Sequence, residues 1–288
     1  MATIRNPVEW LAQEFQHVAL HLRSVGQSVR GAETAAEAVL PAVRQIDVAD
    51  LKDVLAKGYR DFKAYRTDVL FICVIYPVAG LVLARLAFDY DMLPLLFPAA
   101  FGFALLGPVA AVGLYEMSRR REQGMEASWA DAFSVMRSPS FGAIVLLGLL
   151  LLTIFLLWLA AAQLIYMATL GPEPPASVAA FVRDIFTTGA GWAMIVVGMG
   201  VGFVFAVVVL AISVVSFPAL LDRDIGLGAA VMTSVRVVAT NPGSMAAWGM
   251  IVLSGLAIGT VPLFLGLIVV MPVLGHATWH LYRRTVAR

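Results

Sequence analysis

The chain has 288 residues, of which 60% are hydrophobic and only 14% are charged, and its formal net charge is +1. Soluble domains carry roughly 25% charged residues, so this composition excludes an ordinary soluble enzyme, a disordered protein and a nucleic-acid binder with a basic face. Several apolar runs exceed the roughly 18 residues that a transmembrane helix needs. The sequence therefore predicts an all-α membrane protein.

Residues 1–46 are predicted to form a cytoplasmic helical arm. Asn6, Pro7 and Glu9 mark the start of a helix, with Asn6 as its N-cap. Apolar residues then alternate at spacings of three and four, which is the seam of a heptad repeat: Val8, Leu11, Phe15, Val18, Leu22, Val25 and Val29. We expect this seam to bind a helical protein partner or a second copy of the chain. The alternatives are this protein's own cytoplasmic helices and the membrane surface.

Residues 47–288 are predicted to form a six-helix transmembrane domain. The spans are placed on the apolar runs 69–88, 93–115, 141–168, 190–221, 244–260 and 262–282. The last two runs belong to one apolar stretch, which could also hold one span and a re-entrant segment. Gly259 and Pro262 are turn residues, so we place a turn there and count two spans.

The positive charges predict the orientation. Of the 20 lysines and arginines, only Arg85 and Arg183 lie on the side of the membrane opposite the termini when six spans are drawn. Because segments rich in lysine and arginine stay in the cytoplasm, both termini are predicted to be cytoplasmic.

The sequence of this domain predicts three repeats of an interfacial amphipathic helix followed by a helix hairpin, over 47–115, 122–221 and 222–288. The amphipathic helices are expected within 50–66, 126–137 and 225–240, where apolar residues recur at helical spacing. Each helix is expected to lie in the headgroup layer or to pack with the others as a cytoplasmic cap.

A helix-capping residue stands at the corner between each amphipathic helix and the span after it. These residues are Thr67, Ser138 and Asn241. The repeated corner predicts that each of them ends one helix and caps the next.

Two histidine pairs are candidates for binding a metal or haem iron. His276 and His280 share one face near the end of the last span, and His17 and His21 repeat the spacing in the arm. A haem-copper oxidase core requires several histidines on different spans, and the four histidines here do not provide them. We favour the interpretation that His276 and His280 anchor the helix at the membrane interface beside Trp279, so no metal or cofactor is predicted.

Glu116, Arg119, Arg120 and Arg121 form the densest charged cluster on the cytoplasmic side. One interpretation is a docking site for phospholipid headgroups or a partner protein. The favoured one is that the arginines hold this loop in the cytoplasm.

Glycines at GxxxG spacing predict close helix packing in two spans. They are Gly198 and Gly202 in the fourth span, and Gly255 and Gly259 in the fifth.

Motifs between residues 46 and 142 carry a resemblance to a known family. They include Gly58-Tyr59-Arg60-Asp61-Phe62, Gly113-Leu114-Tyr115-Glu116-Met117-Ser118-Arg119-Arg120 and Arg137-Ser138-Pro139-Ser140. With these motifs the chain resembles a bacterial family of predicted integral membrane proteins that is catalogued as a domain of unknown function, some members of which carry a cytochrome c oxidase label. The resemblance implies a place in the bacterial inner membrane. It assigns no catalytic residue.

The sequence offers no catalytic motif. A nucleotide-binding loop, HExxH and GxSxG are absent, and ionisable residues are missing from mid-span positions, which disfavours an enzyme and ion-coupled transport. We expect a non-catalytic accessory, scaffold or assembly subunit of a larger membrane complex, with a respiratory complex as one option. The alternative is a carrier or binding protein for a lipid or hydrophobic small molecule, which the repeats suggest. A cavity between the repeats would favour the carrier.

Overall fold

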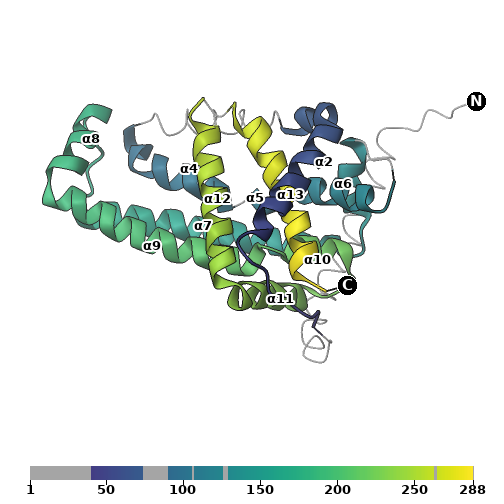
Figure 1. Ribbon diagram of the computed structural model, residues 1–288. Helices are drawn as coiled ribbons and strands as arrows, with labels where there is room; N and C mark the ends of the chain where they lie inside the picture. The colour runs from purple at the N-terminus through teal and green to yellow at the C-terminus, as the bar shows by residue number, and fades with distance from the viewer. Residues whose placement is uncertain (1–39, 74–89, 106, 126–128, 263–264, 288) are drawn as a thin grey trace, which may run out of the picture.

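The computed structural model describes residues 40–73, 90–105, 107–125, 129–262 and 265–287. In these residues the regular elements are helices (Figure 1), so the all-α class is confirmed. In chain order they are α2 (Asp50–Cys73), η1 (Tyr90–Leu95), α4 (Leu96–Leu105), α5 (Gly107–Ala110), α6 (Val112–Glu122), η2 (Trp129–Arg137), α7 (Phe141–Thr169), α8 (Val178–Thr187), α9 (Gly189–Ser213), α10 (Ser216–Asp222), α11 (Leu227–Thr240), α12 (Pro242–Thr260) and α13 (Leu267–Thr285). The predicted heptad helix, with His17 and His21, lies outside the described residues.

Within the described residues, three segments are long and apolar enough to cross a membrane. They are α7, the stretch Gly189–Asp222 that contains α9 and α10, and α12. α7 and α9 lie side by side and are connected at one end through α8 (Figure 1). The 29 residues of α7 extend over about 43 Å, which exceeds a hydrocarbon core of ~30 Å. The three segments coincide with the spans predicted at 141–168, 190–221 and 244–260.

The other three predicted spans are not confirmed. Residues 74–89 of the first lie outside the described part of the chain. The second, 93–115, is divided among η1, α4, α5 and α6. Pro94 and Pro108 lie within it, and proline interrupts a helix because it lacks the N–H and clashes with the preceding turn. The sixth is occupied by α13, whose C-terminal half is polar and packs on α2.

The predicted amphipathic helix at 50–66 is present as the first part of α2, and its main neighbour is α13. Leu51 and Val54 are buried, whereas Tyr59, expected on the same face, is 48% exposed. A Cβ atom at Gly58 would lie 2.6 Å from the backbone nitrogen of Ala277. The two helices therefore approach so closely that only glycine fits at this position.

The second predicted amphipathic helix differs in type, since residues 129–137 form a 3₁₀ helix, η2. The third is present as α11, which buries small and hydroxyl side chains and leaves Met232 and Val235 exposed. The hydroxyls make this possible because Thr233 donates to the carbonyl of Ala229 at 2.7 Å and so brings no unpaired polar group inside.

Of the three predicted caps, only Asn241 occupies its position, as the N-cap of α12. Ser140 is the N-cap of α7, and Ser138 lies two residues earlier. The prediction for Thr67 is wrong, because Thr67 lies inside α2, just after a kink at Tyr65. The repeat of a capped corner is therefore not supported at all three places.

Residues 42–46, assigned to the arm, are joined to the chain's C-terminal end. Val43 and Val286 form a β-bridge, and the amide of Arg44 donates to the carbonyl of Thr285 at 2.7 Å. The side chain of Asn241 accepts from the amide of Ile46 at 2.8 Å and donates to the carbonyl of Arg44 at 3.1 Å. The start of α12, the end of α13 and residues 42–46 thus meet in one place.

Candidate functional site

A buried polar cluster lies where α2, α6 and α13 meet. Oδ2 of Asp61 accepts hydrogen bonds from Oγ of Ser118 at 2.7 Å and from Nε2 of His280 at 2.8 Å. Ser118 also lies 2.8 Å from Nδ1 of His276. Arg121 reaches the other oxygen of Asp61 at 3.3 Å. Four polar side chains and one arginine therefore form a single network in a largely apolar protein.

The sequence places these side chains together through helix periodicity and one close contact. His276 and His280 are one turn apart and share a face of α13. Asp61 follows Gly58 by three residues, so it lies on the face of α2 that Gly58 brings against Ala277. The contact at Gly58 thus sets the separation of α2 and α13, and with it the distance from Asp61 to the helix that carries both histidines.

The geometry of Asp61, Ser118 and His276 differs from that of a nucleophilic triad. Ser118 gives its hydrogen to Asp61, so its oxygen accepts from His276, which assigns the proton of His276 to Nδ1. In a triad the histidine accepts the serine hydrogen instead. Ser118 is also only 1% exposed. The hydrogen bonds of Asp61 with Ser118 and His280 connect three helices, α2, α6 and α13.

The charge of Asp61 is stabilised by its partners. Burial by itself would raise the pKa of this carboxyl, but the hydrogen bonds from His280 and Ser118 outweigh burial and hold the pKa below its usual range. His276 is fully buried, and its Nε2 has no hydrogen-bond partner among the described residues. This nitrogen is a buried, unpaired acceptor.

A groove of about 540 Å³ adjoins this cluster. Its walls come from Arg44, α2, the end of α6 and the end of α13, and Asp61, Ser118 and His280 are among its lining residues. Its remaining lining is mostly charged. Asp50 at one edge accepts a hydrogen bond from Arg284 at 2.6 Å, which holds the pKa of Asp50 below its usual range.

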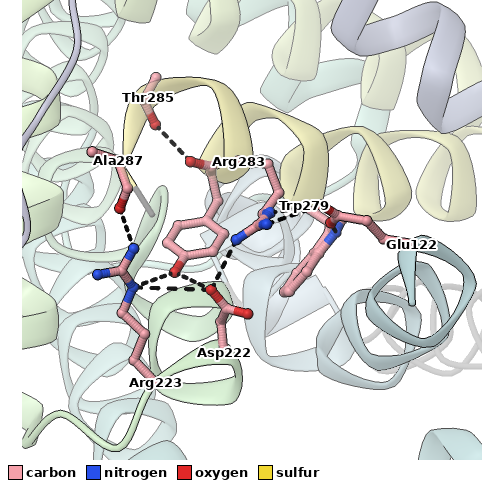
Figure 2. Close-up of polar contacts among 8 residues, drawn as sticks. Glu122, Asp222, Arg223, Trp279, Arg283, Thr285 and Ala287 are labelled. Atoms are coloured by element: carbon pink, nitrogen blue, oxygen red, sulfur yellow. Dashed lines mark hydrogen bonds and ion pairs between the residues drawn. The ribbon is translucent and has the colours of Figure 1, made fainter.

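A second network connects α6 and α10 to the same helix, α13 (Figure 2). Asp222 accepts from the hydroxyl of Tyr282 at 2.7 Å and from Arg283 at 3.1 Å. Arg283 also donates to Glu122 at 2.9 Å, and Glu122 accepts from the indole N–H of Trp279 at 3.1 Å. The end of α13 is thereby fixed from two sides. His276 and His280, expected to anchor at the interface beside Trp279, instead lie inside this packed region.

The predicted docking cluster is largely paired within the chain. Arg119 donates two hydrogen bonds, of 2.7 and 2.9 Å, to Glu116, and Arg120 forms ion pairs with both Glu116 and Asp131. Arg121 contacts Asp61 and the carbonyl of Arg60. Glu116 is buried, so these arginines neutralise a carboxylate that would otherwise be costly inside.

The predicted packing glycines lie in different surroundings. A Cβ atom at Gly202 would meet the ring of Trp158 on α7, and one at Gly255 would meet Val270 on α13. A Cβ atom at Gly259 would meet the side chain of Leu267, at the start of α13. Gly198 faces open space, with no described atom within 4 Å of a Cβ there.

In the described part of the chain, no three His, Cys, Asp or Glu side chains are grouped so as to hold a metal ion. His276 and His280 are engaged by Ser118 and Asp61 instead. Sequence reasoning did not single out Asp61 and Ser118 as site residues. The available signal was Asp61 itself, a carboxylate on the otherwise apolar face of an amphipathic helix.

Apolar helices of membrane-spanning length, joined to a polar helical cap, define the chain as an α-helical integral membrane protein. Residues 96–222 match the family described as Predicted integral membrane protein (DUF2189), whose function is unknown. The resemblance seen in the sequence is thus confirmed over α4 to α10. The match includes Ser118 and Asp222 but neither α2 nor α13. No curated protein and no solved structure matches the chain.

Proposed function

We propose that the protein is a non-catalytic accessory or scaffold subunit of a larger assembly in the bacterial inner membrane. The carrying observation is the uncovered surface of its longest apolar segment: only 6% of the most apolar window of Gly189–Asp222 is buried. On α9, Val196 and Phe203 are 67% and 69% exposed. Because the rest of the chain covers so little of this span, partner helices as well as lipid can contact its surface.

The groove also supports a scaffold over a carrier of hydrophobic cargo. A site for a lipid tail or an apolar small molecule needs apolar walls, whereas charged residues dominate the groove described above. The networks around Asp61 and Asp222 fill the space between α2, α6, α10 and α13 with paired groups, as a rigid support requires.

Both termini are proposed to be cytoplasmic, with an even number of spans. Residues 42–46 bind residues 285–287, which supports placing the two ends of the domain on one side of the membrane. Three crossings alone would leave them on opposite sides. At least one further crossing is needed, and the six predicted spans satisfy this condition.

The proposal is tested by site-specific photocrosslinking in membranes and purification in mild detergent. A photoreactive residue at Val204, which is exposed on α9, should capture a membrane protein in a fixed ratio to the chain. The same residue at buried Val209 of the same helix is the matched control and should crosslink within the chain. Respiratory complexes are the first partners to examine, because some family members carry an oxidase label.

The arm is proposed as a second partner contact, through its heptad seam. Its deletion should stop at residue 39, because removing residues 42–46 would also break their contacts with Asn241 and Thr285. The shortened protein should keep its fold and lose part of the captured partner. Lipid adducts alone at Val204, together with an unchanged assembly size after the deletion, would refute the scaffold proposal.

A further inference from the structure

We infer that the groove between residues 42–46, α2 and the end of α13 is a binding site for a phosphate-bearing anion. This inference goes beyond the accessory role, since a scaffold needs no small ligand. It rests on the charges that line the groove and on the three cations among them that are unpaired within the described residues.

The groove has an excess of unpaired positive charge. The side chains of Arg44, Lys57 and Arg60 line it and make no hydrogen bond or ion pair within the described residues. Arg44 comes from the segment that pairs with the C-terminal end, and the other two come from successive turns of α2. Three cations from two segments thus surround the same space.

The carboxylates of the groove do not neutralise these cations, because most are already occupied. Asp50 is paired with Arg284 at 2.6 Å, and Glu122 with Arg283 at 2.9 Å. Asp61 is held by His280 and Ser118. Only Asp53 lines the groove without an ion pair among the described residues. The unpaired groups are three cations against one carboxylate, an excess of two positive charges.

This excess matches a phosphate monoester better than a carboxylate. A phosphate monoester carries a charge of about −1.5 to −2 near neutral pH and offers three acceptor oxygens. Arginine binds such groups through paired N–H donors, and lysine adds a compact charge. A single carboxylate would leave part of the excess uncompensated. The volume of about 540 Å³ has room for more than the phosphate itself.

The helix that carries Lys57 and Arg60 is held in place before a ligand binds. The hydrogen bonds of Asp61 and the close contact at Gly58 fix α2 against α13, so Lys57 and Arg60 project from a helix that cannot rotate freely. A rigid frame lowers the ordering cost of binding. The phosphate can come from a soluble molecule or from a phosphomonoester lipid headgroup, because the groove belongs to a protein held at the membrane.

The test measures binding of glycerol 3-phosphate to the full-length protein in nanodiscs of phosphatidylcholine, by calorimetry. We expect saturable binding that weakens with salt, and no binding of glycerol. In the double variant Lys57→Gln/Arg60→Gln the dissociation constant should rise about tenfold or more. The matched control is Lys52→Gln/Lys63→Gln, which removes two exposed cations from the same helix outside the groove.

The two sources are distinguished by adding phosphatidic acid to the nanodiscs. If the lipid headgroup is the occupant, phosphatidic acid competes and the apparent affinity for glycerol 3-phosphate falls. If the ligand is soluble, the affinity is the same in both membranes. Absence of saturable binding in phosphatidylcholine nanodiscs, or equal weakening by the groove variant and its control, overturns the inference. Neither result depends on whether partner helices bind α9.

Discussion

Replacing Gly58 by alanine should force α2 and α13 apart. The added Cβ would lie 2.6 Å from the nitrogen and 2.7 Å from the Cβ of Ala277. Non-bonded carbon atoms prefer roughly 3.5–4.0 Å, so the helices must separate by about 1 Å. The contacting atoms belong to the backbone and a Cβ, which no change of rotamer can move away.

The expected loss of stability combines three effects. Overpacking costs roughly 1–3 kcal/mol. A separation of about 1 Å would take the 2.8 Å bond between His280 and Asp61 beyond hydrogen-bonding distance, and a bond to a charged group contributes about 1.5–3 kcal/mol. Alanine's better helix propensity returns up to about 1 kcal/mol. The net destabilisation is therefore about 1.5–5 kcal/mol.

The assay is thermal unfolding of the purified protein in detergent, followed by intrinsic tryptophan fluorescence, with Trp279 buried in the affected region. The matched control is Gly228→Ala in α11, where no described atom lies within 4 Å of the new Cβ. The control should melt at or slightly above the wild-type temperature. If Gly58→Ala melts as high as the control, the close approach of α2 and α13 is refuted.

Three further predictions concern the polar contacts and the topology. Asp61→Ala should destabilise the fold by roughly 3–5 kcal/mol, since it breaks a buried charged network, and equilibrium unfolding measures this. Because the pKa of Asp61 is lowered on folding, its contribution to the free energy of unfolding is present above the ordinary aspartate pKa and is lost as the pH falls through the folded value. The melting temperature of wild type and variant should therefore depend differently on pH in the acid range. The same dependence in both proteins would contradict this. Asn241→Ala leaves the buried amide of Ile46 unpaired, should cost about 1–3 kcal/mol, and should expose the chain near residue 45 to proteolysis. In a Cys73→Ala background, a cysteine at Ala176 should be labelled from outside the cell and one at Gly124 only after permeabilisation.

Apolar length and periodicity predicted the all-α class, the three long apolar segments and the helix at 50–66. These features follow from local composition, which a single sequence contains. Pro94 and Pro108 indicate the division of 93–115 into short helices, but the run as a whole is apolar enough to be predicted as one span. The burial of Thr233 in α11 could not be predicted, because its hydroxyl becomes suitable for burial only once it bonds to the turn before it.

The candidate site was harder to predict than the fold. His276 and His280 were recognised as a pair, yet their partner Asp61 is more than 200 residues away in the chain and its pairing depends on tertiary contact. The positive charge at 119–121 was conspicuous in the sequence, but carboxylates of the same chain pair with all three of those arginines. The unpaired cations of the groove are dispersed in the sequence and become a cluster only when residues 42–46 fold back on α13.

The two halves of α13 lie in different environments, and this difference bears on where the groove lies relative to the membrane. Its first residues, such as Leu267 and Met271, pack among apolar side chains, whereas its last two turns carry His280 and Arg283 into the polar networks. The residues 42–46 and Asn241 meet at its end, so α12 departs from the same level to which α13 returns. If α12 crosses the membrane, the chain between Thr260 and Thr285 must cross back. The polar half of α13 then lies at a membrane surface, together with the exposed charges of α2.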